Sequence, residues 1–170
     1  MALSITSLAE ASPPRVTIRR LDNPALVLEA QYNPDQLKEK IGATYSKQTV
    51  PGLSHQVKQF TNTNDVAMTF RLSFIARSKK DFEGLIAARL FFKTSVRPRG
   101  GVNTVGTAGA PRLFLFWPNF FSMTCVLVSA DISYERFNSD ASPVLMNVDV
   151  AVEEIRDTII LADDFFDEQP

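Results

Sequence analysis

Alternation of apolar and polar residues dominates the sequence and predicts a protein built mainly from β-strands. The pattern is clearest at residues 123–137 and 144–155, where apolar side chains alternate with Ser, Asp, Asn and Glu. Shorter stretches of the same kind occupy residues 15–20, 25–31, 37–45, 66–77 and 112–117. Groups that favour turns, such as Asn33-Pro34-Asp35, separate the strands, and residues 138–143 join the last two as a hairpin.

Residues 78–93 form the one convincing helix pattern. Ser78 or Asp81 can cap its start. Side chains at helical spacing follow at Phe82, Leu85, Ile86, Arg89 and Phe92 or Lys93. About seven antiparallel strands with a single flanking helix predict a mainly β domain, either a barrel or a sandwich.

The domain is expected to span residues 15–156. Residues 1–14 have the composition of a flexible N-terminal tail, and residues 157–170 that of an acidic C-terminal tail. The polar segment 48–64 predicts a long loop or an extended hairpin arm, and the Gly- and Pro-rich segment 97–111 a flexible loop.

Composition excludes several classes of function. The 170 residues carry a net charge of −1, from 18 basic and 19 acidic side chains, so nothing indicates binding of nucleic acid or of an anionic membrane. No apolar stretch approaches the ~20 residues of a membrane span, and the first residues do not resemble a signal peptide. The single cysteine, Cys125, excludes an intrachain disulfide.

Candidate catalytic chemistry is sparse. His55 is the one histidine and lies in the polar segment, where we expect an ordinary surface residue. Cys125 lies among apolar residues, so we expect a buried, inert thiol. Glu153 and Glu154, neighbours on a strand, face opposite ways and cannot share a proton. No spaced cluster of ligands predicts a metal, and no glycine motif predicts a nucleotide. We therefore expect no enzyme activity and no cofactor.

Three motifs carry a resemblance to a known family. The first is the turn Gln31-Tyr32-Asn33-Pro34, and the second is the apolar strand of residues 112–117. The third lies in the last two strands and comprises Val128-Ser129, Ile132, Tyr134, Phe137, Asp140, Pro143, Val148, Val150 and Glu154. In order and spacing they resemble the tube-initiator domain of contractile injection systems, over most of residues 26–155. That family often adds a LysM module, for which no counterpart is expected here.

The resemblance implies a structural protein of a phage tail or a phage-tail-like particle, assembled in the bacterial cytoplasm. It implies a ring of six copies at the baseplate end of the inner tube, between the spike hub and the first ring of tube protein. The implied partners are therefore copies of the chain itself, the inner-tube protein, the spike or hub protein and other baseplate components. Two alternatives remain open at this stage: a repeating subunit of the inner tube, and a small β-barrel that binds a ligand.

In a ring, one face of the sheet packs on the core and the other lines the channel. Along the last two strands, the apolar side chains at alternate positions are expected in the core: Val126, Val128, Ala130, Ile132, Tyr134, Val144, Met146, Val148, Val150 and Val152. The polar side chains at the intervening positions are expected to face the lumen: Ser129, Asp131, Ser133, Asn147 and Asp149. The outer, solvated face of a sandwich is the alternative for these polar residues. An arm that reaches another subunit is expected to include Gln48, Pro51, Gly52, His55, Lys58 and Phe60.

Overall fold

A computed structural model describes residues 14–98 and 109–156, and these contain nine strands and one helix. The elements are β1 (Thr17–Arg20), β2 (Val27–Glu29), β3 (Leu37–Lys40), β4 (Ala43–Gln48), β5 (Val57–Thr63), β6 (Ala67–Ile75), α1 (Lys79–Ser95), β7 (Leu113–Trp117), β8 (Phe121–Phe137) and β9 (Pro143–Glu154). The expected flexible loop lies partly, and the acidic tail wholly, outside the described residues. Of the expected N-terminal tail, only Pro14 is described.

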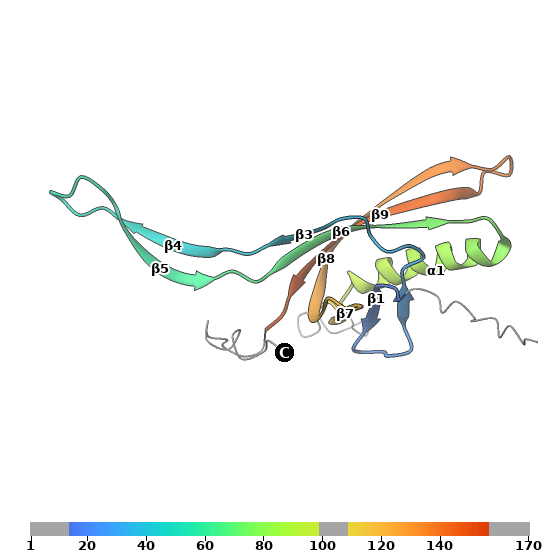
Figure 1. Cartoon of the computed structure of the whole chain (residues 1–170), viewed down its shortest axis with the longest axis horizontal. Helices are drawn as coiled ribbons and strands as arrows, with labels where there is room; N and C mark the ends of the chain where they lie inside the picture. Colours follow the sequence, from blue (N-terminus) through green and yellow to red (C-terminus); the bar gives the residue numbers. More distant parts are fainter. Residues whose placement is uncertain (1–13, 99–108, 157–170) are drawn as a thin grey trace, which may run out of the picture.

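Seven strands form one antiparallel sheet in the order β2-β1-β7-β8-β9-β6-β3, and β4 pairs with β5 in a separate hairpin. The mainly β prediction with a single helix is therefore confirmed. The seven-stranded sheet is open, because its edge strands β2 and β3 do not pair with each other. The barrel alternative is thus not seen in the single chain, and a coiled, sandwich-like sheet fits the structure (Figure 1).

The hydrophobic core lies between the sheet and α1. Leu85 and Phe92 of the helix are buried, as their spacing predicts, whereas Ile86 is 40% exposed. Ser78 caps the helix through a reciprocal capping box: its hydroxyl accepts from the Asp81 N–H, and the Asp81 carboxylate accepts from the Ser78 N–H. Arg89 reaches from the helix over the ring of Tyr134 on β8, 5.9 Å from the ring centre.

A β-bulge between Leu127 and Ser129 divides β8 into two halves. Before it, Cys125 and Leu127 are buried against the core. After it, the core side passes to Ala130, Ile132 and Tyr134. The expected burial of Val126 and Val128 is consequently wrong: Val126 is only partly buried and Val128 is 58% exposed. The extra residue of the bulge reverses the side to which odd and even positions point.

The predicted extended hairpin exists and is longer than the polar segment suggested. It begins at Ala43 in β4 and returns through β5 to Thr63, and every residue of both strands is exposed. Figure 1 shows this hairpin, the arm, projecting well beyond the rest of the molecule. The Asn64 N–H donates to the Gly42 carbonyl at 2.9 Å, so the arm continues the β3–β6 ribbon without a break in pairing.

Two side-chain amides of the Gln31-Tyr32-Asn33-Pro34 turn act as backbone substitutes. Gln31 accepts from the Ile75 N–H at 2.6 Å and donates to the Ile75 carbonyl at 3.0 Å. Asn33 accepts from the Val16 N–H and donates to the Pro14 carbonyl, both at 3.0 Å. The turn thereby connects the C-terminal end of β6 with the segment that leads into β1, although these two strands are not neighbours in the sheet.

Candidate functional site

The outer face of the sheet carries a ladder of polar side chains across β6, β9 and β8. Arg71 stands opposite Asp149, and Asp149 stands opposite Asp131 on the next strand. The Arg71 guanidinium donates two hydrogen bonds to the Asp149 carboxylate, from Nε at 2.7 Å and from Nη2 at 2.9 Å. These bonds raise the pKa of Arg71 and lower the pKa of Asp149, because each stabilises the charged form of its partner.

A second rung lies alongside the first. Ser73 donates to the Asn147 amide oxygen at 2.8 Å, and the Asn147 amide nitrogen donates to Glu135 at 3.0 Å. Ser133 is the register partner of Asn147 on β8. A single face thus holds all five polar residues that were expected opposite the core.

Three members of this face were missed as site residues: Arg71, Ser73 and Glu135. The alternation in residues 66–77 placed Arg71 and Ser73 on the solvated side of their strand. Only the pairing of β6 with β9 brings them beside Asp149 and Asn147, 78 and 74 residues away along the chain. No local pattern in the sequence announces that pairing.

The polar face is acidic. Arg71 is outnumbered by Asp131, Asp149 and Glu135, and Asp131 stands directly across from Asp149 with a like charge. Like charges opposite one another in a sheet are unfavourable. Such a surface repels phosphates.

An open groove runs between the polar face and the turn of residues 32–36. Its volume is about 830 Å³, and its walls include Lys38, Arg71, Asp131 and Asp149. Ligand pockets are usually enclosed and mostly apolar, with few polar groups. The charged, open groove therefore gives the ligand-binding alternative no support.

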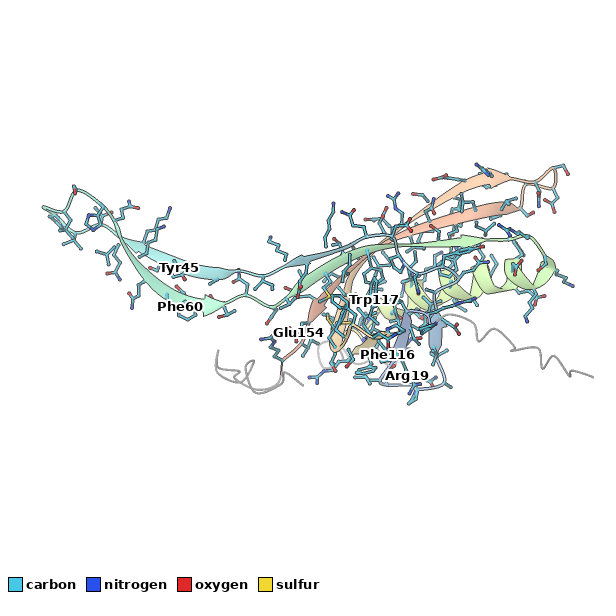
Figure 2. All side chains as sticks on the ribbon, in the orientation of Figure 1. Arg19, Tyr45, Phe60, Phe116, Trp117 and Glu154 are labelled. Atoms are coloured by element: carbon cyan, nitrogen blue, oxygen red, sulfur yellow. The ribbon has the colours of Figure 1, made fainter. Side chains whose placement is uncertain are left out.

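The arm presents a different surface. Tyr45 and Phe60 face each other across β4 and β5 with their rings edge to face, 5.9 Å between centres, and they are 53% and 57% exposed. Figure 2 shows this pair on the arm, remote from the labelled body residues Phe116 and Trp117. Next to it, Lys47 stands opposite Lys58, a second unfavourable like-charge pair.

The predicted arm residues all lie on this hairpin and all are exposed. Gln48 ends β4, and its amide donates to Gln59 at 3.0 Å. Pro51, Gly52 and His55 lie in the connection between the strands, where Gly52 adopts a φ of +90° that favours glycine. An aromatic pair and lysines without acidic neighbours are suited to contacts with another polypeptide rather than to catalysis.

The thiol of Cys125 is fully buried, and desolvation raises its pKa to about 12, so it cannot act as a nucleophile near neutral pH. Within residues 14–98 and 109–156, no group of three or more His, Cys, Asp or Glu side chains could hold a metal ion. Across the same residues, no helix is long and apolar enough to cross a membrane.

An antiparallel sheet with one flanking helix and a projecting arm is an architecture that suits a structural protein. The sequence profile of the contractile injection system tube protein family matches residues 14–160. The chain therefore belongs to the contractile injection system tube protein family, and its role is a structural one related to the tube. A comparison with curated proteins gives no match.

Proposed function

We propose that this protein forms a ring at the baseplate end of the inner tube of a contractile injection system and initiates polymerisation of that tube. The observation that carries the proposal is a three-stranded wing of the sheet that is open on both sides. It consists of residues 71–75 of β6, 143–149 of β9 and 129–137 of β8. The Gln31-Tyr32-Asn33-Pro34 turn and the closing hairpin, which resemble a tube initiator, support the baseplate position.

On the β8 side, pairing with β7 stops at Cys125, so the wing half of β8 pairs with β9 alone. A groove of about 360 Å³ follows this edge, between the last turn of α1 and residues 130–133. On the β6 side, pairing with β3 stops at Phe70, and the Gln31 side chain covers the backbone at Ile75. The wing edge of β8 is therefore available to a strand from a neighbouring copy, and on the β6 edge the part between Phe70 and Ile75 is available.

Two different edges on one subunit make a head-to-tail contact, which generates a closed ring when the rotation between copies allows it. Ring closure removes the unpaired edges that would otherwise make the monomer prone to aggregation. We propose six copies, with the acidic face of Asp131 and Asp149 lining the channel. The partners of the ring are the inner-tube protein above it, and the spike or hub protein and other baseplate components below it.

Copy number tests the initiator role. Particles purified from the source should contain about six copies of this chain, whereas a repeating tube subunit would be present in many rings. Quantitative mass spectrometry of whole particles, calibrated against the hub protein, gives this number. A copy number equal to that of the main tube protein would show that this chain is a repeating tube subunit and not the initiator.

The orientation of the polar face is tested separately. A map of the assembled ring should place Asp131 and Asp149 toward its axis. The alternative, an outer face that is polar because it meets water, predicts that both carboxylates point away from the axis. That result would overturn the channel assignment and leave the ring itself intact.

Catalysis is not part of the proposed role, and assembly is proposed to take place in the cytoplasm of a bacterium. His55→Ala and Cys125→Ala should leave particle activity unchanged, since neither side chain has an activating partner among the described residues. Loss of particle activity in a folded His55→Ala protein that still assembles normal tubes would contradict a purely structural role.

A further inference from the structure

The helix α1 carries apolar side chains on its outer side as well as on its inner side. Leu85 and Phe92 are buried in the core, whereas Ile86 is 40% exposed and Leu90 is 61% exposed. Ile86 and Leu90 are four residues apart and are therefore neighbours on one side of the helix. Among the described residues, the helix packs chiefly on β6 and β8, which lie on its inner side. A helix that is apolar on both sides is suited to burial between two layers.

Basic side chains flank the apolar pair. Residues 77–97 hold six Lys and Arg side chains and two acidic ones, although the whole chain has a net charge of −1. Lys79 precedes the pair and Arg97 follows it, and both are exposed. Of the two acids, Asp81 already accepts from two backbone N–H groups at the start of the helix, which leaves Glu83. The outer side of α1 is therefore positively charged, and we call it the basic helix face.

Two of its charges stand where they oppose the stability of the helix. Lys79 and Lys80 occupy the first turn, where the positive end of the helix dipole disfavours cations. Neither forms an ion pair within residues 14–98 and 109–156. Because the two lysines do not support the fold of the described chain, contact with an anionic partner is the role that their chemistry suits.

The shape of the basic helix face favours a helix as the partner. A strand would leave backbone groups unpaired against it, because α1 satisfies its own backbone N–H and carbonyl groups internally. A helix does the same and presents apolar residues at the same spacing. The 17 residues of α1 offer about 25 Å of contact. An anionic membrane requires a wider apolar face than Ile86 and Leu90 provide, and nucleic acid would leave both uncovered.

We propose that the basic helix face binds an acidic amphipathic helix of a different protein in the particle. Acidic side chains of that helix pair with the basic side chains of α1, and its apolar residues cover Ile86 and Leu90. Figure 1 shows α1 along one side of the sheet, and the core separates it from the polar ladder on the other side. The contact is the same for a tube initiator and for a repeating tube subunit, so the copy number does not bear on it.

Site-specific cross-linking in whole particles tests the partner. A photoreactive benzoylphenylalanine replaces Leu90 in the full-length chain, and mass spectrometry identifies the peptide that it captures on irradiation. We expect an acidic, helical segment of another protein. The matched control carries the same photoreactive residue in place of Phe137, which is also 61% exposed but lies at the end of β8, and it should not capture that segment.

Several results would overturn the proposal. They are the absence of a cross-link from residue 90 in assembled particles, a cross-link to the same chain or to another copy of it, and capture of a segment that is neutral, basic or not helical. Flotation of the free chain with vesicles that contain phosphatidylserine examines the membrane as a partner. We expect no binding, and binding would assign the basic helix face to a membrane instead.

Charge reversal at the start of the helix tests whether charge selects the partner. Lys79→Glu with Lys80→Glu places acids where the helix dipole favours them, so the chain should not unfold at a lower temperature. The yield of the cross-link from residue 90 should fall at least about tenfold, whereas Lys79→Arg with Lys80→Arg should retain it. Failure of the folded Glu pair alone to enter particles would be the same loss of contact. Equal yields from the two pairs would refute selection by charge, and the proposal with it.

Discussion

The side-chain amide of Gln31 makes with the backbone of Ile75 the two hydrogen bonds that a neighbouring strand would make, across 44 residues of sequence. It occupies the wing edge of β6 where β3 has ended. A side chain in this position both stabilises the subunit and stops further pairing at that point. Gln31 thus stabilises the monomer and also sets how far a strand from a neighbouring copy can pair along β6.

Gln31→Ala should destabilise the subunit by about 1–3 kcal/mol, because it leaves a half-buried N–H and carbonyl of Ile75 without partners. Urea unfolding followed by circular dichroism measures the change. Gln48→Ala is the matched control: Gln48 bonds only to another exposed glutamine on the arm and should change stability by less than about 0.5 kcal/mol. Equal effects of the two substitutions would show that the hydrogen bonds of Gln31 with Ile75 do not stabilise the subunit.

Asp149→Asn should lower stability above pH 4 and flatten its decline in acid. The Arg71 hydrogen bonds hold the pKa of Asp149 below the ordinary value of 3.8. A carboxyl whose pKa is depressed in the folded state contributes stability above its unfolded pKa, and the contribution is lost as pH falls through the folded value. The pair is exposed, so the effect is modest. Urea midpoints between pH 2 and 7 measure it.

Asp131→Asn is the contrasting variant on the neighbouring strand. Asp131 faces the like charge of Asp149, so its neutralisation should leave stability unchanged or slightly increased at pH 7. A destabilisation as large as that of Asp149→Asn would mean that Asp131 has a favourable partner in the monomer. In the proposed ring, both substitutions reduce the negative charge of the channel wall.

The thiol of Cys125 should resist modification in the folded protein. Burial raises its pKa to about 12, and the thiolate that reacts is therefore scarce at pH 8. Ellman's reagent should react at least about a hundredfold more slowly in buffer than in 6 M guanidinium, where the side chain is exposed. Rapid labelling of the native protein would show that β8 opens easily beside the bulge.

Deleting residues 48–62 should leave a folded subunit that no longer initiates tubes. Every residue of the two arm strands is exposed and none belongs to the core cluster, so thermal unfolding of the body should be unchanged. Negative-stain microscopy of assembly mixtures then counts the tubes. A full-length protein with Phe60→Ser separates loss of the aromatic contact from loss of length. Normal tubes from the deletion variant would show that the arm is dispensable.

Much of the fold was predictable from local pattern. The two candidate caps, Ser78 and Asp81, marked the start of the helix, and the turn residues between alternating stretches marked the hairpins. The pattern also grouped Ser129, Asp131 and Ser133 on the side away from the core. These features depend on neighbours within a few residues along the chain, which is the information that side-chain periodicity carries.

The bulge in β8 could not be found in this way. Met123, Cys125 and Leu127 are apolar, and so are Val126 and Val128, so either parity suits a core in the first half of the strand. The choice depends on β7, which pairs with residues 121–125, and on β9, whose register shifts at Leu127. Partners distant in sequence decide such a choice.

The sequence by itself therefore determined the mainly β class, the helix and the grouping of polar residues on one face, because composition and short periods are local properties. Tertiary structure alone decided that Arg71 meets Asp149, that Gln31 closes the edge at Ile75, and that Val128 faces solvent. These depend on strand order and register, which result from packing the whole sheet around one core, and no segment of the chain contains that information alone.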